Sequence, residues 1–492
     1  MRMWILMLGI VAFAAAPAFA QRTLTLDDYY KLREVDDPQI SPDANWIAYT
    51  VKTVDAGEDK HVTHVWMTRF DGAQTVQLTN RPKESESKPR FSPDGRFLSF
   101  LSERTDDKHK DQLWLMNRAG GEAQKVSDFK GGITDYVWSP DGKRIALIAS
   151  DPNPEDAETK KEKSPKPIVV DRFYFMEDVT GYLRHFRDHL YVMDVASRKV
   201  DQITSGDFND ALPAWSPDSR SLVFASKRVK DADRSPDWNL FVVAAQKAAN
   251  PRQLTTFTGE DNAPNRFDTG SYPAWSPDGK WIAYWQGGDP KLIEYATNKL
   301  AVIPASGGTP KILTPALDRN IGNVSWSDEG KSLLFSVEDD RTEYLARVPA
   351  GGGKVEHIAG GRNVISAYAQ KRGRFALLIS TSTQPEEVFA WDGKSAPRQI
   401  SHQNDWLKEV KLAPVQEIAF KSKDGTDVHG FLLKPPNGAG GHLPMVLRIH
   451  GGPQSQFADA FSFEWQLLAA HGYAVVAANP RGSTGRGQKY CA

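Results

Sequence analysis

The sequence predicts an all-β propeller of seven blades, followed by the N-terminal part of an α/β domain. Three observations predict this fold. A strand–turn–strand motif built around Ser-Pro-Asp-Gly recurs along most of the chain, and a second strand–turn–strand motif alternates with it. After Trp406 both give way to a hairpin, an apolar strand, a helix and another apolar strand. Regular four-strand repeats are typical of propeller blades, whereas strands alternating with helices are typical of an α/β sheet.

The first 20 residues precede the repeats and have the pattern of a secretory signal peptide. Arg2 carries the only positive charge, residues 4–16 are apolar, and Ala18-Phe19-Ala20 forms a small-x-small cleavage site before Gln21. We therefore expect residues 1–20 to be removed on export. The alternative is an uncleaved membrane anchor, for which the apolar stretch is short.

Composition narrows the class of protein further. The chain has 492 residues, a formal net charge of −1 and a pI near 6.9, so its charge does not favour a nucleic-acid partner. Hydrophobic residues make up 40% of the chain, which is typical of a globular protein. Cys491 is the only cysteine, so the chain has no internal disulfide. We expect a soluble mature protein without stable membrane insertion, in a bacterial periplasm rather than a eukaryotic lumen.

The first motif reads, in one copy, WSPDGKRIAL. Copies begin at residues 40, 91, 138, 215, 275 and 326, a worn copy begins at Ala369, and most start-to-start spacings lie between 43 and 60 residues. Proline presets the first corner of a tight turn, aspartate can accept a hydrogen bond from its own backbone, and glycine accepts a positive φ. The repeated aspartates are therefore interpreted as turn residues and not as metal ligands: Asp94, Asp141, Asp218 and Asp278.

The second motif is a short apolar strand, a polar or glycine-rich turn and a strand that ends near Leu-Thr, as in LAVIPASGGTPKILT. Seven copies alternate with the seven copies of the first motif, and together they predict seven four-stranded units. We therefore assign residues 21–35 to an N-terminal segment and residues 36–408 to a seven-bladed propeller.

One insertion interrupts the regular spacing, between Trp138 and Trp215. Residues 151–167 are charged and contain prolines, which predicts an exposed loop, and residues 171–189 are rich in aromatic side chains. Two histidine pairs have spacings that metal sites can use, but no third ligand is apparent, so we favour structural histidines over a metal site: His185 with His189, and His61 with His64.

Residues 412–492 have a different pattern of predicted strands and helices. A hairpin is predicted over residues 417–435, turned at Asp424-Gly425. Residues 442–450 form a nearly continuous apolar run, which predicts a strand buried on both faces. Residues 463–472 have helical spacing and end at a glycine, and residues 473–483 predict another buried strand followed by a turn. This order predicts the entry to an α/β sheet rather than a further blade.

The sequence His-Gly-Gly-Pro begins at His450, directly after the first of these apolar strands. Open α/β sheets place ligand chemistry at the carboxyl ends of their strands. Glycine lets the backbone approach a substrate closely, and two backbone N–H groups turned toward one oxygen can stabilise an oxyanion. The motif by itself fits an oxyanion-binding loop and a plain strand-to-helix turn equally well.

The repeats and the C-terminal motifs together are more specific than either of them alone. Seven SPDG-type repeats followed by HGGPQSQF, a helix and NPRGSTGRGQKYC resemble the prolyl oligopeptidase family of serine peptidases, above all its exported bacterial dipeptidyl peptidase and acylaminoacyl peptidase-like members. The segment DRFYFMEDVTGYL resembles the insertion that those enzymes carry between blades. The resemblance implies an α/β-hydrolase fold for residues 412–492 and an oxyanion hole that uses the N–H of Gly452, supported by Gly451. It implies that His450 and Arg481 support the loop.

The resemblance also implies a serine nucleophile in a G-x-S-x-G elbow, with aspartate and histidine later in the chain. No such elbow occurs in the 492 residues; the nearest sequences surround Ser483, Ser306 and Ser271. We therefore expect the nucleophile, the acid and the base to lie beyond Ala492, in which case the sequence is a C-terminally truncated fragment without activity. No cofactor and no metal are expected.

Two further functions remain open at this stage. A non-catalytic propeller of the TolB type, acting as a periplasmic interaction module, would also carry SPDG repeats, and another α/β-hydrolase activity such as an esterase is a weaker alternative. Residues 442–483 favour the peptidase, whose propeller would admit only short peptides to the site. The specificity and the oligomeric state are not apparent from the sequence. Candidate residues for binding a peptide terminus lie in the aromatic insertion, although surface placement explains them as well: Glu177, Arg172 and Arg184.

Overall fold

A computed structural model describes residues 21–104, 110–152, 167–177, 181–183, 186–264, 271–438, 441–452 and 454–492. The predicted signal peptide, Arg184, His185 and most of the predicted loop 151–167 lie outside the described residues. The side chain of Glu177 is also not described.

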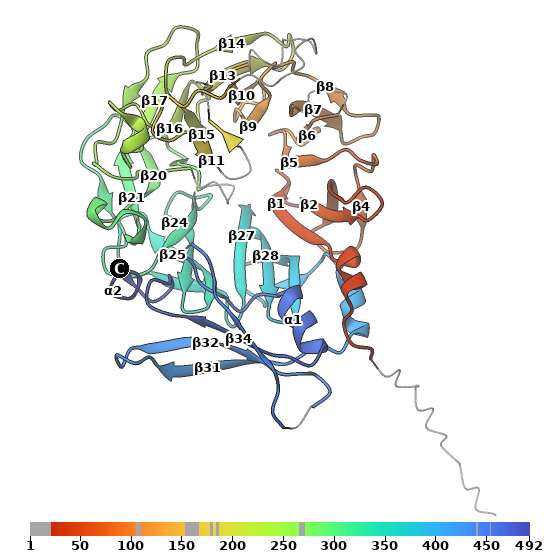
Figure 1. Cartoon of the computed structure of the whole chain (residues 1–492). Helices are drawn as coiled ribbons and strands as arrows, with labels where there is room; N and C mark the ends of the chain where they lie inside the picture. The colour runs from red at the N-terminus through yellow and green to blue at the C-terminus, as the bar shows by residue number, and fades with distance from the viewer. Residues whose placement is uncertain are drawn as a thin grey trace, which may run out of the picture.

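Most of the described chain forms antiparallel sheets whose strands follow one another in sequence. Figure 1 shows these sheets arranged around a common centre, which is the architecture of a β-propeller. The first two four-stranded sheets contain β1 (Glu34–Ile40), β2 (Trp46–Asp55), β3 (Lys60–Arg69) and β4 (Thr75–Gln77), then β5 (Glu86–Phe91), β6 (Phe97–Ser102), β7 (Gln112–Asn117) and β8 (Gln124–Lys125). The third contains β9 (Ile133–Trp138), β10 (Arg144–Ser150), β13 (Asp188–Asp194) and β14 (Val200–Gln202).

Two more four-stranded sheets and one eight-stranded sheet complete this part. The four-stranded sheets contain β15 (Asp210–Trp215), β16 (Ser221–Ser226), β17 (Asn239–Ala244) and β18 (Arg252–Gln253), then β19 (Ala274–Trp275), β20 (Trp281–Gln286), β21 (Lys299–Pro304) and β22 (Lys311–Ile312). The eight-stranded sheet contains β23 (Ile321–Trp326), β24 (Ser332–Asp339), β25 (Thr342–Pro349), β26 (Glu356–Ala359), β27 (Val364–Lys371), β28 (Arg374–Thr381), β29 (Gln384–Trp391) and β30 (Arg398–Gln399). Its two halves are joined through one parallel pair, Glu343 with Val364.

The ring of sheets is closed by side-chain packing. Among the described strands, no sheet combines strands from the two ends of the chain, because β1 pairs with β2 and β27 pairs with β28. Instead Val35 and Ile47 pack against Leu378 and Val388 in one buried cluster. The aromatic insertion forms a short hairpin of β11 (Met176–Glu177) and β12 (Gly181–Tyr182).

The repeated aspartates act as turn residues. In one copy the Ser139 hydroxyl donates to Asp141 at 2.6 Å, and the Lys143 N–H donates to the same carboxylate at 3.0 Å. Gly142 has φ +69° and lies against Pro93 of the preceding copy, so the turn needs a residue that accepts positive φ. The serine-to-aspartate bond is 2.6 Å in the other three copies that contain Asp94, Asp218 and Asp278.

In three consecutive repeats the tryptophan before the turn ties neighbouring sheets together. The indole N–H of Trp215 donates to the Val137 carbonyl at 3.1 Å, and that of Trp275 donates to the Ala214 carbonyl at 3.1 Å. Each acceptor directly precedes the tryptophan of the preceding repeat, so the bonds run from one inner strand to the next. Trp326 continues the series with a bond of 2.9 Å to Ala274.

The C-terminal residues form a separate four-stranded sheet with the strand order β31-β32-β34-β33. The strands are β31 (Val415–Lys421), β32 (Asp427–Leu433), β33 (Met445–Arg448) and β34 (Ala474–Asn479), and β33 runs parallel to β34. The helices are α1 (Phe463–Ala470) and α2 (Gln488–Cys491), and short 3₁₀ helices occur as η1 (Leu26–Lys31), η3 (Ala232–Arg234), η4 (Pro290–Tyr295) and η5 (Asp405–Glu409). Helix α1 packs on β32 and β34 in a buried cluster that includes Phe431, Trp465 and Val475.

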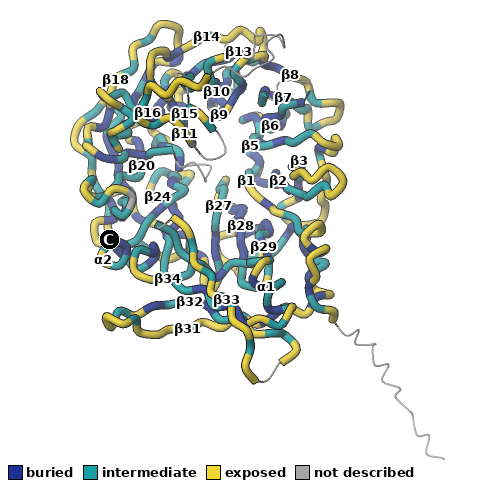
Figure 2. The backbone as a smooth tube through the Cα atoms, in the orientation of Figure 1, coloured by how far each residue is buried: buried dark blue, intermediate teal, exposed yellow. Residues whose placement is uncertain are grey.

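One prediction for this region is wrong. The run 442–450 is not buried on both faces, because Met445, Leu447 and Ile449 are 63%, 55% and 72% exposed. The strand lies at the edge of the sheet with only β34 beside it, and Figure 2 draws it in the colours of exposed and intermediate residues, whereas helix α1 packs on the neighbouring strands β32 and β34. No residue of the run 442–450 is fully buried, and those that face away from the exposed side are only partly covered. In contrast, Val475 and Ala477 of β34 are fully buried, as predicted.

The C-terminal sheet docks on one face of the propeller. Its contacts reach three connections between the second and third strands of their repeats: Asp340 between β24 and β25, Ser380 at the end of β28, and Tyr295 between β20 and β21. The insertion with β11 and β12 joins β10 to β13, which are also the second and third strands of their sheet. It therefore leaves the propeller on this same face. In the described part of the chain, no helix is both long and apolar enough to cross a membrane.

Candidate functional site

Two loops meet at one end of the C-terminal sheet. Residues 449–457 follow β33, and residues 480–484 follow β34. Because β33 and β34 are parallel neighbours, both loops begin at the carboxyl ends of these strands, on the same side of the sheet. This is where α/β sheets commonly bind ligands. We call residues 450–457 the glycine loop and residues 479–484 the support turn.

The glycine loop presents two exposed glycines. Gly451 and Gly452 are exposed, and among the described residues no hydrogen-bond acceptor pairs with either backbone N–H. Gly452 has φ +133°, and a Cβ placed there would lie 2.6 Å from the backbone nitrogen of Gln454. Only glycine fits this position without a shift of the loop. The arrangement leaves two donors open to an oxygen atom.

His450 has a partner at each ring nitrogen. Nε2 lies 2.8 Å from the Ser483 hydroxyl, and Nδ1 lies 3.0 Å from the Gly451 carbonyl oxygen. The ring also meets Phe457 edge to face, with 5.2 Å between ring centres. The predicted supporting place of His450 in the loop agrees with these contacts, but its role in activity stays a prediction.

The support turn holds the glycine loop at further points. The Phe457 N–H donates to Asn479 Oδ1 at 2.8 Å, and Asn479 Nδ2 donates back to the Phe457 carbonyl at 2.9 Å. The Thr484 N–H donates to the Ser455 carbonyl at 2.9 Å. Asn479 and Thr484 are buried. The loop is therefore fixed by three residues of the support turn: Asn479, Ser483 and Thr484.

Arg481 points to the turn between β31 and β32 rather than to the glycine loop. Its guanidinium pairs with Asp424 at 2.9 Å, in the turn between β31 and β32, and both side chains are well exposed. The structure therefore brings His450 to Ser483 but does not bring Arg481 to the glycine loop. Sequence reasoning gave the loop-holding role to the arginine and did not assign it to the other polar residues of NPRGST. A signal existed, because this polar cluster directly follows a buried strand.

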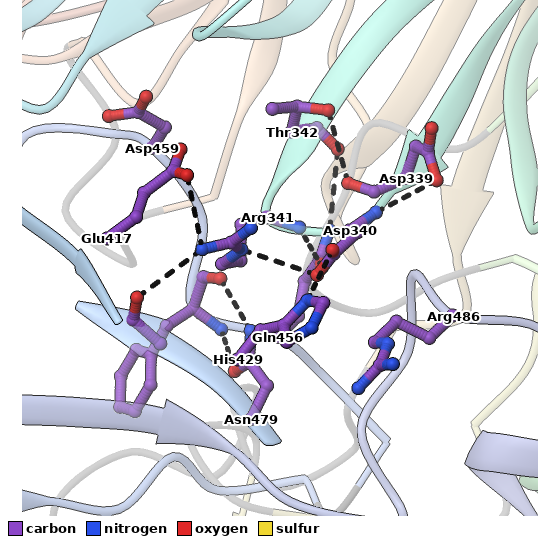
Figure 3. Close-up of polar contacts among 12 residues, drawn as sticks. Asp339, Asp340, Arg341, Thr342, Glu417, His429, Gln456, Asp459, Asn479 and Arg486 are labelled. Atoms are coloured by element: carbon purple, nitrogen blue, oxygen red, sulfur yellow. Dashed lines mark hydrogen bonds and ion pairs between the residues drawn. The ribbon is translucent and has the colours of Figure 1, made fainter. Parts of the chain in front are cut away.

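The propeller also contacts the glycine loop, through the turn between β24 and β25 (Figure 3). The Arg341 N–H donates to Gln456 Oε1 at 2.8 Å, and the Asp459 N–H donates to the Arg341 carbonyl at 2.6 Å. Asp340 Oδ2 lies 2.6 Å from Nδ1 of His429 on β32. This turn thus fixes the segment that follows the two glycines relative to the propeller.

A buried carboxyl group lies beneath the same junction. The Thr484 hydroxyl donates to Glu338, a residue of β24. Burial raises the pKa of the Glu338 carboxyl above its usual value, although the hydrogen bonds from Thr484 and Asn320 act in the opposite direction. The support turn therefore contacts strand β24 of the propeller as well as the glycine loop.

The other serines near the family pattern have structural surroundings. Ser483 is 1% exposed, so its hydroxyl is closed to a substrate. Ser271 is 7% exposed and accepts the Val324 N–H at 3.0 Å, within the propeller. Ser306 lies on an exposed turn after β21, far in sequence from the glycine loop.

The structure describes only some of the remaining candidates for peptide binding and metal binding. Arg172 pairs with Asp233, with Nε 2.9 Å from Oδ2, so its charge is engaged within the propeller. His189 is buried, with Nδ1 3.8 Å from Asp210, and His64 Nδ1 lies 2.9 Å from Glu86. In the described ranges, no three histidine, cysteine, aspartate or glutamate residues are grouped as metal ligands would be.

Comparisons with known proteins find relatives for both parts of the chain. The model of the dipeptidyl peptidase IV N-terminal region matches residues 171–299, and the model of the prolyl oligopeptidase family matches residues 459–492. The uncharacterized peptidase YuxL of Bacillus subtilis is 29% identical over 96% of this chain and 72% of its own length. Dipeptidyl-peptidase 5 of Porphyromonas gingivalis is 24% identical over 95% of this chain and 69% of its own length.

Solved structures agree in fold. An acylaminoacyl peptidase of Pyrococcus horikoshii superposes with a TM-score of 0.75 at 21% identity, over 94% of this chain and 68% of that one. The β-propeller domain of the trilobed protease from Pyrococcus furiosus, described as having an open velcro topology, superposes with a TM-score of 0.53 at 16% identity, over 76% of this chain and 99% of that one.

Proposed function

Because the chain belongs to the prolyl oligopeptidase family of serine peptidases, we propose that its glycine loop is half of the oxyanion hole of an exopeptidase or oligopeptidase for short peptides. The observation that carries this proposal is the pair Gly451–Gly452. Both glycines are exposed at the end of a parallel strand, on a loop that a buried turn holds in place. Fixed donors of this kind stabilise the oxyanion that forms when a serine attacks a peptide carbonyl.

The reaction follows acyl transfer through an acyl-enzyme. A serine attacks the carbonyl carbon, the carbonyl oxygen becomes negatively charged, and the N–H groups of Gly451 and Gly452 bind that oxygen. The amine leaves with a proton, and water then releases the acyl group. The names of the similar proteins, a dipeptidyl-peptidase and an acylaminoacyl peptidase, support cleavage near one end of a short peptide.

The placement of the propeller supports a gating role. The C-terminal sheet docks on the face that carries the connections between second and third strands, and the insertion with β11 and β12 leaves the same face. A substrate at the glycine loop would then lie between the propeller and the sheet, which favours short peptides. In this proposal the two halves of the eight-stranded sheet count as separate blades, since a single pair joins them, and the ring has seven.

We further propose that these 492 residues alone do not hydrolyse peptides. They contain no G-x-S-x-G elbow, and the one serine beside the loop, Ser483, is buried and bonded to His450. The purified chain should give no turnover of dipeptidyl or acyl-aminoacyl reporter substrates. It should also show no labelling by a fluorophosphonate probe, read by intact mass. Labelling at any serine would contradict this part of the proposal.

The glycine loop itself can be tested in a chimera. The part of the Bacillus subtilis relative that lies outside the matched span is fused after residue 492, and hydrolysis of both reporter classes is measured. We expect activity, and we expect Gly452→Ala to lower kcat by about 10²–10³-fold, the effect of losing an oxyanion donor, because the added Cβ would clash with Gln454 and displace the Gly452 N–H. Gly438→Ala is the matched control, because Gly438 also has positive φ (+67°) but lies in an exposed turn where an added Cβ would meet no atom within 4 Å.

Two outcomes would overturn the proposal. If the folded chimera binds neither class of peptide and hydrolyses none, the non-catalytic interaction module becomes the better explanation. If Gly452→Ala and Gly438→Ala behave alike in an active chimera, the glycine loop is not part of the oxyanion hole.

A further inference from the structure

We propose that Ser483 is a positioning residue, which fixes His450 in one tautomer and thereby sets the direction of the Gly452 N–H. The inference rests on the proposed function of the glycine loop, because it names how the donor of that loop is aimed. It concerns hydrogen bonds that exist in the chain as it stands, so it can be tested without any hydrolysis.

The tautomer follows from the partners of the two ring nitrogens. Nδ1 of His450 lies 3.0 Å from the Gly451 carbonyl oxygen, and a carbonyl oxygen can only accept a hydrogen bond. Nδ1 must therefore carry the proton. In the neutral ring Nε2 is then the acceptor, and the Ser483 hydroxyl, 2.8 Å away, must donate to it.

Ser483 is well placed to enforce this choice. Its side chain is 1% exposed, and its backbone N–H donates to the Pro480 carbonyl at 3.0 Å. The next residue, Thr484, donates its N–H to the Ser455 carbonyl at 2.9 Å. The hydroxyl is therefore held on a rigid turn that is itself bonded to the glycine loop. A buried hydroxyl of this kind can orient an imidazole ring but cannot reach a substrate.

The direction of the Gly452 N–H follows from the geometry of the peptide bond. The Gly451 carbonyl and the Gly452 N–H belong to one planar trans peptide unit, so they point in opposite directions. When His450 Nδ1–H holds the Gly451 carbonyl oxygen on the side of the imidazole ring, the Gly452 N–H must point away from that ring. There Gly452 is exposed and among the described residues has no acceptor.

Removal of the Ser483 hydroxyl should weaken both hydrogen bonds of the His450 ring. Without the donor at Nε2, the proton can move to Nε2. Nδ1 then presents a lone pair to the Gly451 carbonyl, which repels it. The peptide unit between Gly451 and Gly452 can then rotate, because it is flanked by two residues without a Cβ, whose backbone dihedrals are the least restricted. Ser483→Ala should therefore change the tautomer and the loop together.

The test uses the 492-residue chain labelled with ¹⁵N in its histidine rings. Long-range ¹H–¹⁵N spectra recorded at about pH 9, where imidazoles are neutral, distinguish the two tautomers, and His450→Gln assigns the signal among the 11 histidines. We expect His450 as the Nδ1–H tautomer in the unchanged chain, loss of this single form in Ser483→Ala, and its return in Ser483→Thr, which restores a hydroxyl.

The control is Ser306→Ala, at an exposed serine in a turn of the propeller. It should leave the His450 signal unchanged. The inference is overturned if the unchanged chain shows the Nε2–H tautomer, a result that needs no variant to fold. It is also overturned if Ser483→Ala, with the other histidine signals unaltered, keeps the Nδ1–H form. An inactive chimera with the expected His450 signals would instead count against the proposed function alone.

Discussion

Single side chains decide the geometry of the glycine loop. Asn479 uses both ends of its amide on Phe457, accepting from the N–H and donating to the carbonyl. An aspartate of the same shape could make only the first of these bonds, and an alanine could make neither. The residue is 1% exposed, so water would not replace a lost bond. The conformation of Gly452 thus depends on polar groups that the sequence places about 30 residues away.

Asp261 predicts a pH dependence of stability at the scale of one residue. It is fully buried, and burial raises the pKa of its carboxyl to about 7 against a smaller lowering by the Thr255 hydroxyl. In the unfolded chain an aspartate ionises near pH ~3.9. The folded protein therefore holds a proton that the unfolded chain has lost, and stability falls as the pH rises from about 4 to about 7.

Asp261→Asn removes this ionisation. We expect the variant to unfold at a higher temperature than the unchanged chain at about pH 8, and at a similar temperature near pH ~3, where the carboxyl is largely protonated in both states. Thermal melts followed by circular dichroism at both pH values measure the difference. Asp278→Asn, at an exposed turn position, is the control. A variant that is no more stable at pH ~8 would contradict the assignment.

The strands and turns are specified locally, but the ties between sheets are not. The Ser-Pro-Asp-Gly turns could be read from the sequence, because each depends on bonds between residues two apart, such as Ser139 to Asp141. A tryptophan precedes the turn in the copies that begin at residues 215, 275 and 326. Its indole bond to the preceding repeat joins residues about 50 to 80 positions apart and could not be predicted from a single copy.

Trp275→Phe tests these ties at the scale of the element. The change keeps an aromatic ring but removes the donor to the Ala214 carbonyl. We expect a loss of about 1–2 kcal/mol in the free energy of unfolding, because a hydrogen bond between two sheets is lost and its acceptor is left unpaired. Denaturant unfolding followed by circular dichroism gives the value.

Trp281→Phe provides the comparison within the same sheet, since Trp281 is 38% exposed on β20. It should change stability by less than Trp275→Phe does. Equal losses in the two variants would show that ring volume rather than the indole bond matters at Trp275.

At the scale of the whole molecule, sequence reasoning succeeded where patterns repeat and failed where neighbours decide. The order of hairpin, strand, helix and strand after Trp406 could be predicted, because each element has its own periodicity. The burial of the run 442–450 depends on which elements lie beside it, since an apolar strand reads the same at an edge as in the centre of a sheet. The contacts His450–Ser483 and Arg481–Asp424 depend on how two distant turns meet. No local pattern of residues predicts these contacts.

Arg341 tests how firmly the propeller holds the C-terminal sheet. The side chain is 13% exposed and lies 3.3 Å from Asp340, 3.5 Å from the Gly430 carbonyl and 3.6 Å from Glu417, so its charge connects the turn between β24 and β25 with β31 and β32. Arg341→Ala removes all three contacts and leaves the two carboxylates without this partner. We expect a cost of about 1.5–3 kcal/mol to the docking of the sheet, the range for hydrogen bonds to charged groups.

Limited proteolysis measures the docking, because a loosened sheet exposes the connection between residues 408 and 414. Arg341→Ala should be cut there faster than the unchanged chain, while the propeller fragment stays intact. Arg347→Ala is the matched control, since Arg347 lies on β25, which directly follows the turn of Arg341, and pairs with Glu356 at 2.7 Å with both side chains half exposed; exposed pairs of this kind contribute little. If the two variants were cut at the same rate, the Arg341 contacts would not hold the sheet, and other contacts of the turn, such as Asp340 with His429, would have to account for the docking.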